Sequence, residues 1–297
     1  MANTFSNLDV EIIARSAVVG FRQGLLPLDA ISKNVSPEPA ERGNSVKVLR
    51  LSSAGTVQTF DPATGYAIAD STADGVDVAL DKHKFVSWQL TDKEKIGTAI
   101  SDIETFGLLK GWNLAKQVLT DVLAAVTAAK FGAAVTSSDA ADFDLDAVFD
   151  IRNALTVAGW PPIGRALVLD SAYYANLLKE LKIASAAGGD AELRNGTLTR
   201  LAGFNVFESA IIPANGEDLK GFAVEPDALL VALRYLAPQE GHKYEIAEPV
   251  VDADSGVTLG LRQWYDENSG SKRCVLEALY GSNVGNPAAL KRIVSAS

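Results

Sequence analysis

The chain has 297 residues, which is enough to bury a hydrophobic core and to form two domains. Its formal net charge of −10 argues against a surface that binds nucleic acid or an anionic membrane. No apolar run approaches the ~20 residues of a membrane-spanning helix, and the first residues lack the pattern of a signal peptide. The only cysteine, Cys274, excludes an intrachain disulfide and fits a reducing cytosol, and we expect a buried, inert thiol in a strand.

The N-terminal third predicts a helix, an arm and a long β-hairpin. Ser6 can cap a helix that continues to about Gln23. The polar segment 31–44 is rich in turn residues and is expected to be an extended arm. Strands are expected at 45–51 and, after a long polar stretch, on a return through 76–90 where apolar residues alternate. This hairpin has few apolar residues, so it needs its own body or a neighbouring subunit to lie on.

The longest predicted helix covers residues 103–130 and joins the hairpin to the following domain. Gly111 is its only weak point, at a cost of about 1 kcal/mol relative to alanine. The TDKE sequence at 91–94 is a capping box that opens a short helical segment before it. One buried face is predicted from apolar residues at helical spacing: Leu108, Trp112, Ala115, Leu119, Val122 and Val126.

Residues 142–243 predict an α/β layer, because short strands and helices alternate. A helix is expected from Leu145 to a C-cap at Gly159. The strand RALVLDS, the helix AYYANLLKELK and two strands separated by Gly203 should follow. A strand at 222–224 and a helix in PDALLVALRY complete the layer.

The last third predicts three long antiparallel strands joined by two turns that end in glycine. The strands are YEIAEPVV, VTLGLRQWY and SKRCVLEALYG, and the turns are DADSG and DENSG. The chain then ends with a short strand in NPAALKRIVSAS.

No constellation of catalytic residues is apparent. His83 and His242 fall in different predicted domains, and structural roles are favoured over a general base or a metal ligand. The chain has no nucleophile elbow, no GxxxxGK[ST] phosphate loop and no strand-linked GxGxxG. The alternating acids Asp142, Asp144 and Asp146 lack the glycine and glutamate of a calcium loop and are expected to stabilise the start of the next helix. No catalytic, cofactor-binding or metal-binding residue is predicted.

Basic residues cluster at 82–95, at the base of the hairpin. A solvated face is the default interpretation of such a cluster. A strip of ion pairs with a neighbouring subunit is the alternative.

Segments spread over nearly the whole chain carry a resemblance through their order: RGNSVKVLR, GWNLAKQVLTDVLAAV, RALVLDSAYYANLL, NGTLTRLAGFNVFES, PDALLVALR, GVTLGLRQWYD, CVLEALYG and PAALKRI. This order resembles the major capsid protein of tailed bacteriophages, which has the Hong Kong 97-type fold. The ordered set carries the resemblance, because this fold is held by topology more than by signature residues.

The resemblance implies an α+β fold with an N-terminal arm, an extended β-hairpin loop, a peripheral domain with a long spine helix, and an α/β axial domain. The implied boundaries are 1–44 for the arm, 45–90 for the extended loop, 91–141 and 244–285 for the peripheral domain, and 142–243 with 286–297 for the axial domain. The implied function is that of a structural protein, not an enzyme. It would assemble through hexamers and pentamers into the icosahedral head shell that encloses double-stranded DNA.

The implied partners are copies of the chain itself, a separate scaffolding protein and a portal, with no membrane, no cofactor and no sequence-specific DNA binding. The protein would be assembled in the bacterial host cytoplasm and reside in the virion. Negative charge fits this function, because each neutralised phosphate would add affinity that impedes DNA packaging and release. Two alternatives stay open: an encapsulin-type shell that holds cargo enzymes, and an α/β enzyme with its site in 142–243, against which the missing motifs argue.

Overall fold

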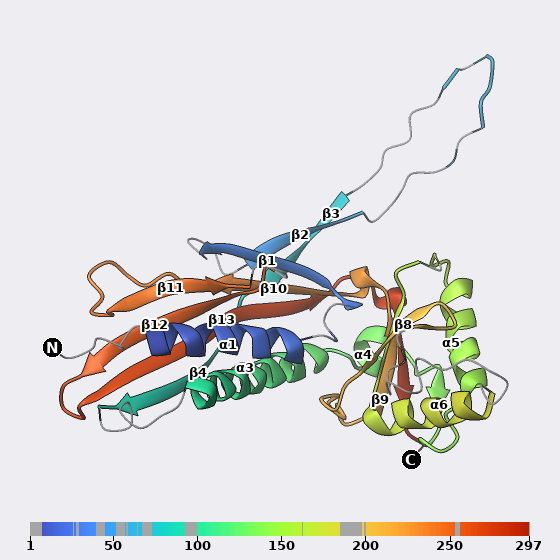
Figure 1. The fold of residues 1–297 in the computed structure, drawn as a ribbon. Helices are drawn as coiled ribbons and strands as arrows, with labels where there is room; N and C mark the ends of the chain where they lie inside the picture. Colours follow the sequence, from blue (N-terminus) through green and yellow to red (C-terminus); the bar gives the residue numbers. More distant parts are fainter. Residues whose placement is uncertain are drawn as a thin grey trace.

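The computed structural model describes residues 8–25, 27, 30–39, 45–51, 57, 59–63, 65–66, 73–92, 100–161, 163–184, 198, 200–252 and 256–296. Figure 1 shows an elongated part with long strands and two helices beside them, and a compact part with helices on a shorter sheet. A hairpin projects from the elongated part, away from the body of the molecule. Within the described ranges, no helix is both long and apolar enough to cross a membrane.

The elongated part is built on a six-stranded sheet, called here the large sheet. Its order is β1-β10-β13-β12-β11, and β4 pairs with the other edge of β13. The strand bounds are β1 Ser32–Pro39, β4 Lys82–Thr91, β10 Leu229–Tyr235, β11 Ile246–Val251, β12 Thr258–Asp266 and β13 Ser271–Val284. All pairs are antiparallel except β1 with β10. The predicted C-terminal strands are confirmed, with Gly256 and Gly270 at positive φ in their turns. The predicted arm contains β1, a strand that its polar sequence did not indicate.

Two helices, α1 Leu8–Gly24 and α3 Ile100–Leu123, lie side by side along this sheet (Figure 1). Leu119 and Val122 of α3 are buried as predicted, in one core cluster with residues of β12 and β13. Trp112, predicted on the same face, is 43% exposed.

Glycines set the distance between the two helices. A Cβ added at Gly111 would lie 1.8 Å from the carbonyl oxygen of Ala17, and one added at Gly20 would lie 2.3 Å from the carbonyl oxygen of Leu108. Gly111 therefore does more than weaken α3, because only a residue without a side chain permits this contact.

The predicted helix end at residue 130 is wrong, because α3 ends at Leu123. The side-chain amide of Asn215 donates to the carbonyl oxygens of Leu123 and Val126 at 3.0 and 2.8 Å, and so satisfies acceptors that a helix terminus leaves without partners. A separate helix, α4 Ala128–Phe131, begins where the backbone N–H of Ala128 donates to the Glu217 carboxylate. Part of the predicted capping box at 91–94 lies outside the described residues.

The compact part contains a second sheet, called here the small sheet, in the order β5-β14-β9-β6-β8-β7. Its strands are β5 Thr136–Ser137, β6 Ala166–Leu169, β7 Arg200–Leu201, β8 Phe204–Glu208, β9 Leu219–Val224 and β14 Leu290–Val294. The helices α5 Leu145–Val157 and α6 Ser171–Ala184 pack on one face of it. Val168 and Phe222, on the other face, belong to the same core cluster as α3, so the two sheets share a core.

Local signals within 142–224 predicted this part well. Gly159 follows α5 at φ 86°, and Gly203 separates β7 from β8 at φ 90°. The carboxylate of Asp170 accepts a hydrogen bond from the N–H of Ala172 at 3.0 Å in the first turn of α6. The predicted strands and helices of this segment are confirmed.

The helix predicted in PDALLVALRY is wrong. The segment forms a 3₁₀ turn, η3 Pro226–Ala228, and then β10, which lies between β1 and β13. All residues of β10 except Arg234 are buried, which explains a continuous apolar run that sequence alone does not distinguish from a buried helix. Strand pairing therefore places β10 in the large sheet, although the predicted axial domain 142–243 included it. Strand pairing also places β4 in the large sheet. The hairpin was predicted to continue to residue 90, but it ends before β4 begins at Lys82.

A kinked two-stranded ribbon joins the two sheets. β9 pairs with β14 in the small sheet, and the continuations β10 and β13 pair in the large sheet. Both strands bend at a 3₁₀ turn, η3 in one and η4 Pro287–Ala289 in the other. The N–H of Gly285 donates to Ala228 and the N–H of Glu225 to Ala289, both at 3.0 Å, so the two bends are bonded to each other.

The close contact between α1 and α3 predicts that Gly111→Ala destabilises the subunit. Alanine gains about 1 kcal/mol in helix propensity, but overpacking against the Ala17 carbonyl should cost about 1–3 kcal/mol and force the helices apart. We expect a lower Tm in thermal unfolding.

Asn113→Ala is the matched control, because Asn113 is an exposed residue of the same helix. It should leave the Tm unchanged or raise it. A higher Tm for Gly111→Ala would mean that propensity outweighs the contact.

Candidate assembly surfaces

The residues singled out for possible chemistry have structural roles. His83 lies 3.0 Å from the Glu277 carboxylate through Nε2, and His242 accepts a hydrogen bond from the N–H of Tyr244 through Nδ1 at 3.3 Å. Asp144 caps α5 by accepting from the N–H of Ala147 at 2.9 Å, which confirms the capping interpretation. In the part of the chain that the structure describes, no three His, Cys, Asp or Glu side chains are grouped to hold a metal ion.

Cys274 is buried on β13, as predicted. Burial raises the pKa of its thiol to about 12, so the reactive thiolate is absent at neutral pH. The thiol therefore acts as a small apolar group in the core.

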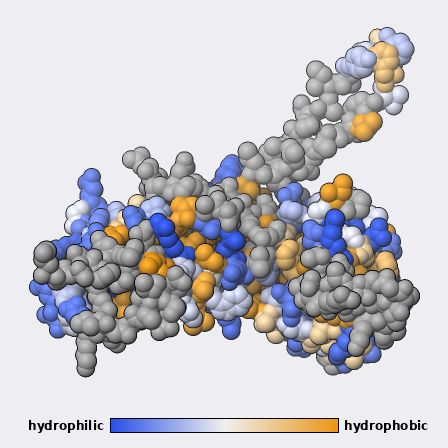
Figure 2. Space-filling view, viewed as in Figure 1, coloured by the Kyte–Doolittle hydropathy of each residue, from blue (hydrophilic) through white to orange (hydrophobic). Residues whose placement is uncertain are grey.

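Exposed apolar residues gather at the end of the hairpin, called here the hairpin tip: Val57, Phe60 and Tyr66, with 98%, 54% and 87% of their surface exposed. The rings of Phe60 and Tyr66 lie 4.8 Å apart between centroids. Between them, Asp61 accepts backbone N–H groups from Gly65 through its carbonyl and from Ala63 through its carboxylate. Figure 2 shows hydrophobic groups at this far end of the molecule.

The root of the hairpin is fixed to the body. Its strands, β2 Ser45–Leu51 and β3 Ala73–Ala79, pair antiparallel, and Val78 packs with Leu230 and Ala232 of β10. The side-chain amide of Asn283 donates to the carbonyl of Asp77 at 3.0 Å. A Cβ at Gly281 would lie 1.7 Å from the carbonyl oxygen of Ala79, so the hairpin backbone touches β13 directly. The contacts of the root thus set the direction in which the hairpin leaves the body.

The face of the large sheet opposite α1 and α3 carries a groove. Alternation along β4 and β13 turns Trp88 and Cys274 toward the helices and Phe85 and Val275 to the opposite face. The groove has a volume of about 550 Å³. We call it the open-face groove, and its lining residues are Phe85, Ser87, Trp88, Gln89, Trp264, Arg273, Cys274 and Val275.

The open-face groove combines aromatic walls with a guanidinium group. Phe85 is 61% exposed, and Trp264 contacts Tyr244 edge-on with ring centroids 5.8 Å apart. Arg273 pairs with Asp266 at 2.5 Å, and its Nε is buried with no hydrogen-bond partner among the described residues.

Helix α3 presents a third exposed apolar surface: Phe106, Leu109 and Trp112, which follow one another at helical spacing. Lys110 reaches over the Phe106 ring at 5.1 Å and also donates to the carbonyl of Ser87 at 3.2 Å. This lysine therefore links α3 to β4.

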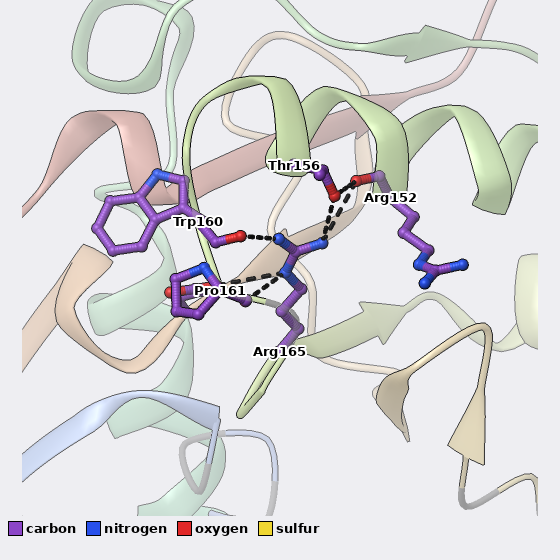
Figure 3. A network of polar contacts seen from close by, with 6 residues as sticks. Arg152, Thr156, Trp160, Pro161 and Arg165 are labelled. Atoms are coloured by element: carbon purple, nitrogen blue, oxygen red, sulfur yellow. Dashed lines mark hydrogen bonds and ion pairs between the residues drawn. The ribbon is translucent and has the colours of Figure 1, made fainter.

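Arg165 organises the turn that follows α5 in the compact part. Its side chain is 2% exposed, and its guanidinium lies among acceptors at the end of the helix (Figure 3). It donates to the carbonyls of Arg152, Trp160 and Pro161 and to the Thr156 hydroxyl. Its Nε also pairs with the buried Glu225 at 3.3 Å. Burial raises the pKa of the Glu225 carboxyl, and the hydrogen bond and charge of Arg165 oppose that rise.

The turn that Arg165 holds is flanked by exposed apolar residues. Val157 and Ile163 are 80% and 81% exposed. Because the hydrogen bonds of Arg165 fix the turn, these side chains are presented in a defined position.

The basic cluster at 82–95 is only partly described. Lys82 donates to the carbonyl of Asp121 at 3.0 Å within the same subunit. Lys93 and Lys95 lie outside the described residues. The alternative of an intersubunit ion-pair strip thus stays a prediction, and Lys82 has an internal partner.

Comparisons with known proteins identify the fold to which this geometry belongs. No family model and no curated protein matches the chain. A solved structure from Mycobacterium phage Che8 is 23% identical and covers 86% of this chain and 85% of its own, with a TM-score of 0.55. The capsid structure of cyanophage P-SCSP1u is 14% identical over 90% of this chain and 87% of its own, with a TM-score of 0.59. The chain has the Hong Kong 97-type capsid fold. This confirms the α+β fold class and the resemblance at the level of the fold.

The same fold extends to a virus-like particle from Pyrococcus furiosus. That structure is 15% identical, with a TM-score of 0.53, over 95% of this chain and 98% of its own. Phage capsid proteins of this fold are structural proteins and not enzymes.

Loss of the Arg165 charge should destabilise the compact part. Arg165→Met would leave the Glu225 carboxylate buried without its cation, and removal of one partner of such a pair costs about 3–5 kcal/mol. We expect a clearly lower Tm and a lower yield of folded protein.

Arg152→Met is the matched control, because the Arg152 side chain is exposed and only its carbonyl takes part in the network. It should change the free energy of unfolding by no more than about 0.5 kcal/mol and so leave the Tm nearly unchanged. Equal Tm values for both variants would contradict the role of Arg165.

Proposed function

We propose that this chain is the major capsid protein of a tailed bacteriophage, a structural protein that forms an icosahedral shell around double-stranded DNA. The observation that carries the proposal is the similarity of nearly the whole chain to phage capsid structures. The exposed apolar tip and helix surfaces support it, since such surfaces on one chain mark contacts with other chains.

In this proposal the parts of the subunit take the following roles. Residues 1–44 form the N-terminal arm, and the hairpin β2–β3 forms the extended loop. Helix α3 and the strands β4, β10, β11, β12 and β13 form the peripheral domain, with β4 and β10 added to it on the basis of strand pairing, and α1 and β1 of the arm pack on it. The small sheet with α5 and α6 forms the axial domain, around which five or six subunits meet.

The proposed partners are further copies of the chain in hexamers and pentamers, a separate scaffolding protein and a portal. Assembly would take place in the cytoplasm of the bacterial host. The net charge of −10 supports a shell that encloses DNA without gripping it.

A shell that holds protein cargo is the second candidate, and the similarity to the Pyrococcus furiosus particle favours it. The content of purified particles separates the two functions. DNA-filled heads support the phage capsid, whereas particles that co-purify with an enzyme and without DNA support the cargo shell.

The first test is assembly itself. The purified chain, alone and co-expressed with a scaffolding protein encoded beside it, should form capsomer rings or closed particles visible by negative-stain electron microscopy. A chain that stays monomeric in every such condition and turns over a small substrate would contradict the proposal.

Assembly should also protect the hairpin tip. Chymotrypsin cleaves after exposed aromatic residues, and Phe60 and Tyr66 are the exposed aromatic residues of the tip. We expect rapid cleavage at both in free subunits and slow cleavage in particles, because ordering a tip costs about 1–2 kcal/mol per residue and only contacts with a neighbour can offset it.

Cleavage sites are read by mass spectrometry, with Phe60→Ser/Tyr66→Ser as the control that removes them. Equal cleavage of the tip in free subunits and in particles would show that it is not an element between subunits. If ion pairs in the 82–95 cluster contribute, high salt should also weaken assembly.

A further inference from the structure

The loop between β8 and β9, residues 209–218, fastens the compact part to the end of α3. We call it the Asn215 loop, because the side-chain amide of Asn215 donates to two carbonyl oxygens at that end, at 3.0 and 2.8 Å. The Glu217 carboxylate accepts from the N–H of Ala128 and pairs with Arg292 of β14. Two side chains of one short loop therefore hold the end of α3, the start of α4 and the last strand together.

The Asn215 loop contains a tight turn that few pairs of residues can form. Asn215 and Gly216 have φ values of 54° and 70°, and the N–H of Glu217 donates to the carbonyl of Ala214 at 2.9 Å. Two consecutive positive φ values within such a hydrogen bond are the mark of a type I′ turn, in which asparagine followed by glycine is strongly preferred. The backbone thus explains why this pair stands here.

The same pair is open to a spontaneous reaction. The backbone nitrogen that follows an asparagine can attack the carbon of the side-chain amide, and glycine hinders this attack least because it has no side chain. Asn215 is partly exposed and Gly216 is exposed, so water reaches the turn. The sequence contains one other such pair, Asn195–Gly196, which lies outside the described residues.

We propose that Asn215 is a site of spontaneous deamidation, and that the reaction takes place only after the Asn215 loop has left the end of α3. Once formed, the product prevents the loop from returning. The site therefore records each opening of the loop in the covalent structure of the chain. This inference goes beyond the proposed shell function and does not depend on it.

The reaction needs no reagent except water. The nitrogen of Gly216 forms a bond to Cγ of Asn215 and gives up its proton. The bond from Cγ to the side-chain nitrogen breaks, and this nitrogen takes up a proton and leaves as ammonia. The product is a five-membered succinimide ring. Water then adds to one of the two ring carbonyls and opens the ring, which leaves an aspartyl or an isoaspartyl residue at position 215.

The docked loop resists this reaction because the leaving group is the atom that holds the loop. The nitrogen lost as ammonia is the donor to the carbonyls of Leu123 and Val126. Both hydrogen bonds must break before it can leave. Each such bond adds to the barrier, so the reaction in the docked loop should be at least about tenfold slower than in an unfolded chain.

The product cannot make the same contact. A carboxylate at position 215 has no N–H to donate, and its negative charge would face the carbonyl oxygens of Leu123 and Val126. The end of a helix carries partial negative charge, so an anion is unfavourable there. The two carbonyls also lose the donor that satisfied them. The deamidated loop therefore stays away from α3.

Deamidation rates test the proposal. The full chain is incubated at mildly alkaline pH, folded in buffer and unfolded in guanidinium chloride, and peptides are analysed by mass spectrometry. We expect Asn215 to react at least about tenfold more slowly in the folded chain. In the unfolded chain, Asn195 is the internal reference and should react at a similar rate. Equal rates at Asn215 in the folded and the unfolded chain would overturn the proposal.

A variant that loosens the loop gives a second measurement. Glu217→Gln removes the charge that pairs with Arg292, so the loop should open more often and Asn215 should react several-fold faster in the folded protein. Glu240→Gln is the matched control, because Glu240 is exposed, and should leave the rate unchanged. Both are measured well below the Tm of each variant. An unchanged rate in Glu217→Gln would show that opening of the loop does not control the reaction.

The effect of the product is tested with Asn215→Asp, which places the carboxylate there from the start. We expect a lower Tm than in the starting protein. Asn205→Asp makes the same chemical change at an exposed position of β8 and should leave the Tm nearly unchanged. Equal Tm values for the two variants would contradict the claim that the product is excluded from the end of α3.

Discussion

The close contact between α1 and α3 is the packing on which the elongated part depends. The strands of the large sheet bury one face, and a single helix is too narrow to cover it. Gly20 and Gly111 let the two helix backbones approach until both helices reach the core. The same core continues into the small sheet through Val168 and Phe222. A change in the spacing of the helices would therefore disturb the packing of both parts of the subunit.

Local sequence patterns were sufficient to predict the helices and strands that are determined by neighbouring residues in the sequence. Alternation and glycine turns predicted β11, β12 and β13, and the acids ahead of Leu145 with the C-cap at Gly159 predicted α5. The end of α3 could not be predicted, because it depends on Asn215, which is 92 residues away in the sequence. β10 was mistaken for a helix, although a signal was present: EPDAL at 225–229 and NPAAL at 286–290 are similar, and both form a 3₁₀ turn before a strand.

The two candidate surfaces also differ in whether the sequence alone could locate them. The tip could be located from sequence, because Val57 and Phe60 stand out in a polar stretch. The open-face groove could not, because Phe85 and Trp264 come together only through the register of β4 on β13 and of β13 on β12. A shift of one residue in either register would turn one wall of the groove toward the helices.

The kinked ribbon between the sheets has a mechanical consequence. Tension between the two parts of the subunit runs along β9, η3 and β10 and along β13, η4 and β14, two stretches of backbone that each bend at a 3₁₀ turn. Hydrogen bonds of antiparallel pairs lie perpendicular to the strands, so this load acts on them in shear, and many bonds share the force. A subunit stretched by the internal pressure of a filled container would thus resist along its strongest direction. Under such a load, the contacts between subunits would separate before the two parts of one subunit do.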